Sequence, residues 1–226
     1  MAEVIVALDV DSPDEAQGLV DRLPNLRWAK VGSRLFLRHG PAVIGELKNR
    51  GVSVFLDLKW HDIPTAVAAA VSAARDLGVD LATVHASGGR KMLQAAVGAQ
   101  GSMRLAAVSV LTSHTPEGYG EAIGLDSVDL QQEVSRLAGM AAATGIGAVV
   151  ASPWELGTVR QVIPDGTWLV VPGIRPPGAD LGDQHRTADP RAAAEAGATH
   201  LVVGRPIIES DKPEVVYQQI CEAVAR

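Results

Sequence analysis

Two carboxylates and one ammonium group lie within six residues of this sequence, at Asp57, Lys59 and Asp62. They follow the apolar run 54–56, and a short apolar run bounded by turn residues is typical of a buried strand in a parallel sheet. Side chains alternate along a strand, so Asp57 and Lys59 are expected on one face. Charges in such a place are costly unless they are paired. A structural ion pair would account for Asp57 and Lys59, but the third charge at Asp62, just before Pro64, favours a reactive site.

The neighbours of Lys59 limit the chemistry of its amine. Nearby carboxylates favour the charged ammonium form, whereas an amine that forms a Schiff base must be neutral. The spacing therefore predicts that Lys59 is a proton donor or a fixed positive charge. Asp9, Asp57 and Asp62 are also of the type that binds a divalent metal through oxygen, although an ammonium among them already neutralises much of their charge.

Eight apolar runs alternate with helical segments along the chain, at a spacing of roughly 25–30 residues. Such alternation indicates parallel βαβ units, and eight of them in 226 residues predict a (β/α)8 TIM barrel that forms a single domain over residues 1–226. An open doubly wound sheet is the alternative, but the first strand is not followed by Gly-x-Gly-x-x-Gly. The predicted strands are 4–8, 28–31, 54–58, 80–84, 105–111, 147–150, 168–171 and 201–203.

Several helix boundaries are also encoded locally. Ser12 and Ser152 are each followed by Pro and, three residues later, by Glu, which predicts two capping boxes. One helix is predicted over about 35–50, and others begin at Pro64, Leu130 and Pro213.

In a barrel of this kind the catalytic groups lie at the carboxyl ends of the strands, which converge on one mouth. Each polar residue there is weak evidence alone, but together they predict one site. The residues in question are Asp9, Lys30, Asp57, Lys59, His85, Thr112, Ser113, Ser152, Gly204 and Arg205.

A phosphate site is predicted after the last two strands, where such barrels often bind phosphate. Gly204 lets the backbone approach an anion, and Arg205 offers a bidentate clamp. Arg175 and Gln184 lie in a loop of 16 residues, 172–187, whose length suggests a lid. The alternative is that these arginines are solvated surface residues.

The composition excludes several functional classes. A formal net charge of −6 argues against a general nucleic-acid binder. The chain lacks an apolar run near the ~20 residues that span a membrane, and its first residues do not resemble a signal peptide. The single cysteine, Cys221, excludes an internal disulfide and a cysteine-based metal cluster. We therefore expect a cytoplasmic protein.

The sequence resembles the orotidine 5′-phosphate decarboxylase family over its whole length. The run from Asp57 to Pro64, Asp-Leu-Lys-Trp-His-Asp-Ile-Pro, is similar to the family signature. The Gly-Asp-Gln at 182–184 and the Val-Gly-Arg-Pro-Ile at 203–207 resemble its phosphate-binding segments. Asp-x-Lys-x-x-Asp alone is shared with related barrels that act on sugar phosphates, and the added His-Asp-Ile-Pro and Gly-Asp-Gln make the match specific.

The resemblance implies loss of CO2 from orotidine 5′-phosphate to give UMP, the last step of de novo pyrimidine synthesis, without cofactor or metal. It implies a homodimer with shared sites. Lys59 would protonate C6, Asp57 would lie against the departing carboxylate, and Asp62 would reach the partner subunit's site. Substrate contacts are implied for Asp9, Lys30, Ile63, Thr65, Thr112, Ser113, Arg175, Gln184, Gly204 and Arg205.

The sequence departs from the family pattern beside the signature. Trp60 replaces the usual Phe or Leu, and Thr65-Ala66 stand where Asn-Thr is common. Two alternatives follow for the ribose contact of the missing threonine: Thr65 takes it over, or the contact is absent. The roles of His61 and His85 stay open at this point. The competing interpretations are a metal-dependent sugar-phosphate decarboxylase or aldolase of the same superfamily, and a non-catalytic phosphate-binding barrel.

Overall fold

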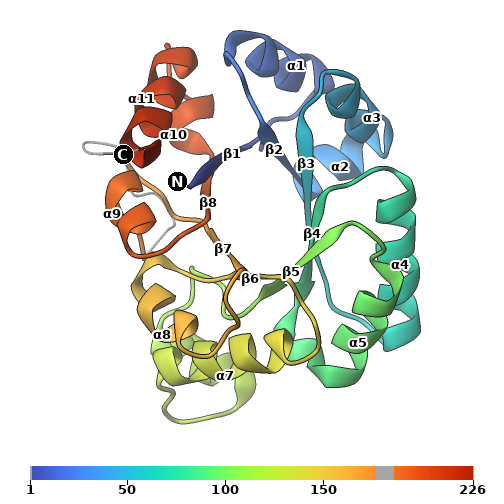
Figure 1. The fold of residues 1–226 in the computed structure, drawn as a ribbon, viewed down its shortest axis with the longest axis vertical. Helices are drawn as coiled ribbons and strands as arrows, with labels where there is room; N and C mark the ends of the chain where they lie inside the picture. The colour runs from blue at the N-terminus through green and yellow to red at the C-terminus, as the bar shows by residue number, and fades with distance from the viewer. Residues whose placement is uncertain (1, 177–185, 226) are drawn as a thin grey trace.

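The chain folds into a closed barrel of eight parallel strands, and the computed structural model describes residues 2–176 and 186–225. Each strand pairs with the next along the chain, and β8 returns to pair with β1, which confirms the (β/α)8 prediction. Figure 1 shows the strands in the centre with the helices in a ring around them. The strands are β1 (Glu3–Ala7), β2 (Trp28–Gly32), β3 (Ser53–Trp60), β4 (Leu81–His85), β5 (Arg104–Val108), β6 (Ala148–Val150), β7 (Trp168–Val171) and β8 (His200–Val203).

Helices connect successive strands and cover the outside of the barrel. The longer ones are α1 (Pro13–Arg22), α4 (Pro64–Asp76), α5 (Gly89–Ala99), α7 (Leu130–Ala142) and α11 (Pro213–Ala225). The shorter ones are α2 (Ser33–His39), α3 (Ala42–Asn49), α6 (Pro116–Ile123), α8 (Leu156–Arg160), α9 (Pro190–Glu195) and α10 (Arg205–Ile208), with two 3-10 turns at Ala86–Gly88 and Pro153–Glu155.

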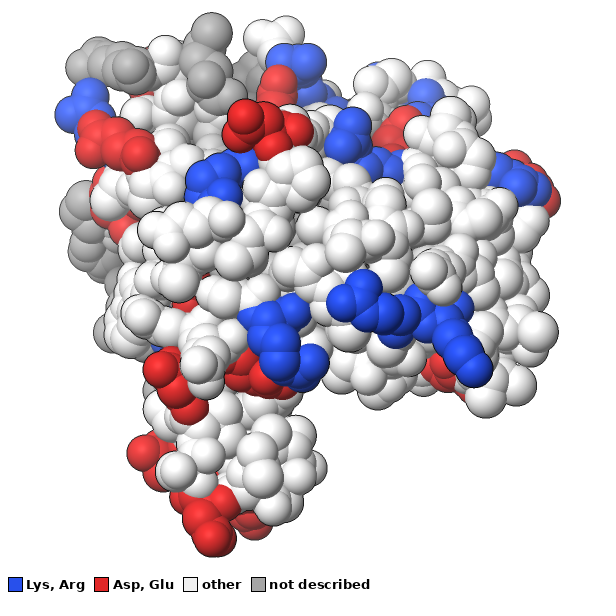
Figure 2. Space-filling view, turned by 60° about the horizontal axis from the view of Figure 1, so that its bottom comes forward, with Lys and Arg blue, Asp and Glu red and all other residues white. Residues whose placement is uncertain are grey.

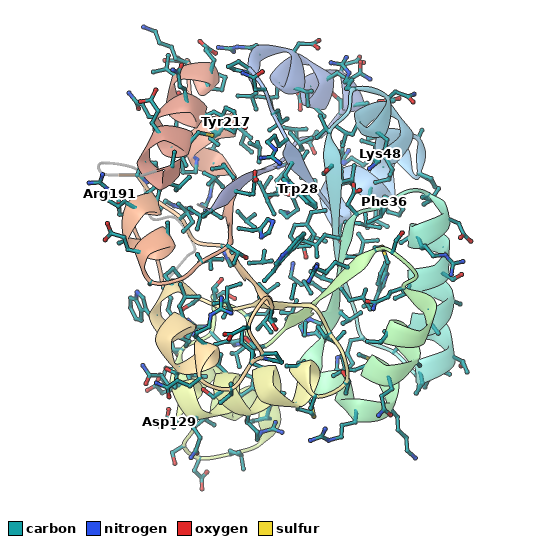
Figure 3. All side chains as sticks on the ribbon, in the orientation of Figure 1. Trp28, Phe36, Lys48, Asp129, Arg191 and Tyr217 are labelled. Atoms are coloured by element: carbon teal, nitrogen blue, oxygen red, sulfur yellow. The ribbon has the colours of Figure 1, made fainter. Side chains whose placement is uncertain are left out.

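The apolar residues form two packed layers. The larger layer lies between the strands and the helices, and the smaller fills the interior of the barrel with side chains that include Ile5, Phe55 and Leu81. Aromatic rings extend the inner layer at the amino ends of the strands, where Trp28 lies against Trp168 with ring centroids 6.0 Å apart. Trp28 is seen within the ring of strands in Figure 3. The filled interior leaves the opposite, carboxyl end of the barrel as the place for a site.

Three local features differ from the predicted elements. The helix predicted over 35–50 is two helices, because Gly40 has a φ of +64° and Pro41 follows it, so the first helix ends there. The strand predicted over 105–111 ends at Val108. The capping box at Ser152 is complete. At α1 only half of the predicted box is present: the Ser12 hydroxyl accepts from the Glu15 N–H, but the Glu15 carboxylate accepts from the Asp11 N–H and not from the Ser12 N–H.

Among the helices of residues 2–176 and 186–225, none is long and apolar enough to cross a membrane. Figure 2 shows small groups of Lys and Arg, most of which lie next to Asp or Glu, with wide areas of neither kind between these groups. The face in this view therefore does not present one continuous basic surface.

Candidate active site

A cavity of about 570 Å³ opens at the carboxyl ends of the strands. It brings together predicted site residues that are far apart in the sequence, because the barrel converges its strand ends on one mouth. The predicted residues that line it are Asp9, Lys30, Asp57, Lys59, Thr112, Ser113, Arg175, Gly204 and Arg205.

The centre of the site is a carboxylate held between two ammonium groups. Lys59 Nζ lies 2.9 Å from each oxygen of Asp57, and Lys30 Nζ lies 3.5 Å from Asp57 Oδ2. Lys30 also donates to Asp9 Oδ1 at 3.0 Å. Charges therefore alternate from β1 across β2 to β3, and each ammonium group has a carboxylate partner.

Asp57 stays ionised in this setting. Its side chain is only 12% exposed, and burial alone would raise its pKa. The charges of Lys30 and Lys59, together with hydrogen bonds from Lys59 and Thr83, outweigh burial and hold the pKa of Asp57 below its ordinary value. The site thus contains a fixed negative charge next to a fixed positive one.

The backbone of β3 is distorted where it carries Lys59. Its pairing with β4 shifts between Leu56 and Trp60, and Lys59 adopts a φ of +51°. The regular side-chain alternation predicted from the sequence is thus interrupted here, although Lys59 still reaches Asp57. A β-bulge of this kind re-aims a side chain next to an active site.

Thr83 of β4 supports this distortion, and sequence reasoning missed it. Its hydroxyl accepts from the Lys59 N–H at 2.8 Å and donates to Asp57 Oδ1 at 3.1 Å. Thr83 is 1% exposed. The available signal was a hydroxyl residue inside an otherwise apolar strand core, where a buried hydroxyl needs partners.

Gly32 and Arg34 shape the wall near Asp9. A Cβ atom on Gly32 would lie 3.1 Å from Asp9 Oδ1 and 3.2 Å from Lys30 Nζ, so glycine leaves room for that ion pair. Arg34 also lines the cavity, where it donates to the Asp9 carbonyl at 3.0 Å and pairs with Asp11. Arg34 was not predicted, because a charged residue at the start of a helix is common on surfaces.

Asp62, Ile63 and Thr65 are exposed and are not among the described residues that line the cavity. Asp62 accepts a hydrogen bond from the Ile63 N–H at 2.6 Å, and Ile63 is 64% exposed. Within this chain Asp62 therefore lies outside the array around Lys59. Over residues 2–176 and 186–225, no three or more His, Cys, Asp and Glu side chains are grouped to hold a metal ion.

The other side of the cavity is lined by the residues predicted to bind the pyrimidine and the phosphate. Arg175 is buried, its backbone N–H donates to the Ala188 carbonyl at 2.9 Å, and its guanidinium donates to the Ile174 carbonyl at 2.9 Å. Gly204 is the N-cap of α10, and Arg205 is the first residue of that helix. The predicted Gln184 and the predicted lid, apart from its ends, lie outside the described residues.

His61 and His85 lie together beside the array, with ring centroids 5.6 Å apart. Burial, and then the positive charges of His61 and Lys59, lower the pKa of His85. His85 is therefore neutral at neutral pH. Neither histidine is among the described residues that line the cavity.

The whole chain is similar to known decarboxylases. The family model described as "Orotidine 5'-phosphate decarboxylase / HUMPS family" matches residues 2–220. An orotidine 5'-phosphate decarboxylase from Halorhodospira halophila (strain DSM 244 / SL1) is 46% identical over 98% of this chain and 95% of its own length. One from Synechococcus sp. (strain CC9311) is 44% identical with the same coverage.

A solved structure agrees with these sequence matches. The crystal structure of orotidine 5'-phosphate decarboxylase from Lactobacillus acidophilus superposes with a TM-score of 0.88 and 33% identity, over the full length of both chains. The similarity therefore extends through every unit of the barrel and is not confined to the Asp57–Lys59 motif. From the family model, the identities and the coverage it follows that this chain belongs to the orotidine 5′-phosphate decarboxylase / HUMPS family.

Proposed function

We propose that this protein decarboxylates orotidine 5′-phosphate to UMP, the last step of de novo pyrimidine synthesis, without a cofactor. The observation that carries the proposal is the Lys30–Asp57–Lys59 array inside the cavity of a family member. Loss of CO2 leaves an electron pair on C6 of the pyrimidine. An ammonium group already in place stabilises that charge without reorganisation and then donates a proton to the carbon.

Lys59 takes that role in our proposal, and Asp57 lies against the substrate carboxylate before it departs. Because Asp57 is held ionised, the Lys59 ammonium group has a negative partner beside it while CO2 leaves. Asp9 and Lys30 bind the ribose hydroxyls. Thr112 and Ser113 contact the pyrimidine edge.

Phosphate binding is assigned to Arg205, with the backbone at Gly204, Arg175 on the opposite wall and Gln184 from the loop. These groups are remote from C6, so the energy of binding them can be used to hold the reacting part of the substrate against the array. This division separates the charged chemistry at β3 from anchoring at β7 and β8.

We further propose that the whole chain acts as one catalytic domain in a cytoplasmic homodimer. Asp62, Ile63 and Thr65 are exposed at the start of α4, where a second copy can receive them. In this arrangement Asp62 completes the array in the partner's site, and Thr65 contacts the ribose there. The dimer would therefore be the active unit.

The test is to mix the purified protein with orotidine 5′-phosphate and to follow the ultraviolet absorbance of the pyrimidine. We expect conversion to UMP at an undiminished rate in EDTA, which distinguishes the proposal from a metal-dependent sugar-phosphate decarboxylase or aldolase. A folded, dimeric preparation that leaves the absorbance unchanged would refute the proposal. Binding of UMP without any turnover would instead favour a non-catalytic phosphate-binding barrel.

A further inference from the structure

A buried ion pair lies behind the cavity wall, outside the array described above. Glu155 is 2% exposed and Arg186 is 5% exposed, and their charged groups are in direct contact. The second Glu155 oxygen accepts from the Ser152 N–H at 2.9 Å, within the capping box that follows β6. Neither side chain is among the described residues that line the cavity. Two charges are rarely buried unless they are paired and fully hydrogen-bonded.

Two other nitrogens of Arg186 contact the backbone of the cavity wall. Its Nη2 donates to the Leu111 carbonyl at 2.8 Å, and its Nε lies 3.5 Å from the Thr112 carbonyl. Leu111, Thr112 and Ser113 all line the cavity. A planar guanidinium can bind a carboxylate on one side and carbonyl oxygens on the other, which an ammonium group does less well.

Segment 111–113 needs such an anchor because it lies beyond the barrel ladder. Strand β5 ends at Val108, and the segment forms an irregular turn in which the His114 N–H donates to the Leu111 carbonyl at 3.0 Å. Arg186 connects this turn to the 3-10 turn Pro153–Glu155 after the neighbouring strand. Trp154 of that turn donates from its indole to the Thr187 carbonyl at 3.2 Å, so residues 186 and 187 are both attached there.

We propose that Arg186, held by Glu155, is a positioning residue that fixes segment 111–113 so that Thr112 and Ser113 meet the pyrimidine ring. The inference rests on the proposed function, which assigns the base contacts to Thr112 and Ser113. It adds that recognition of the base depends on a group that does not touch the substrate. The proposed contacts to the ribose and to the far side of the phosphate lie on other walls of the cavity, at Asp9, Lys30, Gly204 and Arg205, so we expect Arg186 to affect binding of the base more than binding of the ribose phosphate.

The experiment compares two ligands that differ by the base, UMP and ribose 5-phosphate, whose dissociation constants are measured by titration calorimetry. The variants are R186K and the double variant R186M/E155L. Replacing both members of a buried pair by apolar residues avoids leaving one charge unpaired, so the double variant is expected to fold. R186K keeps a positive charge that can pair with Glu155, but it lacks the planar guanidinium that contacts the two carbonyl oxygens.

The matched control is R104M at the other end of the barrel. Arg104 also donates to a backbone carbonyl, that of Gly147 at 2.9 Å, and it lies over the ring of Trp168. Its loss perturbs the fold without touching segment 111–113. We expect R104M to bind both ligands as the wild type does.

For the double variant we expect UMP to bind at least about tenfold more weakly and ribose 5-phosphate to bind within about twofold of wild type. R186K should show a smaller loss in the same direction. Equal losses for both ligands, or UMP binding within twofold of wild type in both variants, would overturn the inference. If the double variant is unfolded, R186K alone decides between these outcomes. A wild-type protein that neither binds UMP nor turns over orotidine 5′-phosphate would instead refute the proposed function.

Discussion

Lys59 Nζ lies 2.9 Å from each of the two carboxylate oxygens of Asp57, so the ammonium group is positioned before any substrate arrives. A charge fixed in advance lowers the barrier without reorganisation during the reaction. An ammonium group paired with a carboxylate in this way suits a proton donor and not an amine nucleophile. The proposed chemistry therefore depends on Lys59 more than on any other side chain.

Replacing Lys59 by alanine should remove turnover and leave ligand binding. We expect kcat to fall by at least about a thousandfold, because the cation that meets the charge at C6 is lost. UMP should still bind, since its phosphate and ribose contacts are on other residues. The measurements are steady-state kinetics and a UMP titration.

The control for this variant is Lys48→Ala, which removes a lysine that pairs with Asp80 at 2.7 Å outside the cavity. It should keep wild-type kinetics. Normal turnover by the Lys59→Ala variant would show that another group donates the proton.

Replacing Thr83 by valine should impair both stability and catalysis. The change keeps the shape of the side chain but leaves the Lys59 N–H without its acceptor and takes one donor from Asp57. We expect the free energy of unfolding to fall by about 1–3 kcal/mol and kcat/KM to fall by about ten- to a hundredfold. Thr83→Ser retains the hydroxyl and should restore most of the activity. A valine variant with wild-type kcat/KM would show that Thr83 does not position Lys59 or Asp57 for turnover.

His200 should make the fold sensitive to moderate acid. It is packed against Trp168 with ring centroids 4.2 Å apart, and burial, followed by the charge of Arg104, lowers its pKa from 6.5 to about 4. Between these two values the unfolded chain binds a proton that the folded chain does not. Stability is therefore lost as the pH falls from about 6.5 to about 4, by about 3 kcal/mol at ~1.36 kcal/mol per pKa unit.

Urea unfolding of the wild type and of His200→Gln at pH 7 and pH 4 measures this loss. The variant should lack it, whereas losses from carboxylates such as Asp57 are common to both proteins. Equal pH dependence of the two unfolding free energies would contradict the assignment.

Mixing two inactive variants tests the shared site. Lys59→Ala and Asp62→Ala homodimers each lack one residue in both sites. A heterodimer has one site with both residues intact if Asp62 acts in the partner's site. Random exchange of subunits should then restore about a quarter of the wild-type activity, because half of the dimers carry one intact site of two. No recovery after subunit exchange would place Asp62 and Lys59 of one chain in the same site.

Much of the fold follows from local patterns in the sequence. The alternation of apolar runs with helical segments predicts all eight strands, and the capping box at Ser152 is present as predicted. One error occurs where a short-range signal competes with a periodic one. Gly40 and Pro41 end α2 inside an apolar pattern that continues into α3.

The site was predictable where a residue's type and its position at a strand end agree, as for Asp9, Lys30, Asp57 and Lys59. Thr83 and Arg186 were not predictable in this way. Their importance lies in hydrogen bonds to the backbone of segments 24 and 75 residues away. A sequence pattern gives the types of the side chains. It does not show which backbone carbonyl or amide, far away in the chain, needs a hydrogen-bond partner from one of them.

The left-handed backbone at Lys59 places a conformational penalty on the residue that we propose as the proton donor. An L-residue in that conformation costs roughly 1–2 kcal/mol, which glycine would not incur. Glycine at position 59 would relieve that penalty, but it would also remove the ammonium partner that contacts both oxygens of the buried Asp57, so the two effects on stability oppose each other. The ion pair with Asp57 thus offsets the conformational penalty at this position, and the same ion pair sets the place of the ammonium group for the proposed reaction.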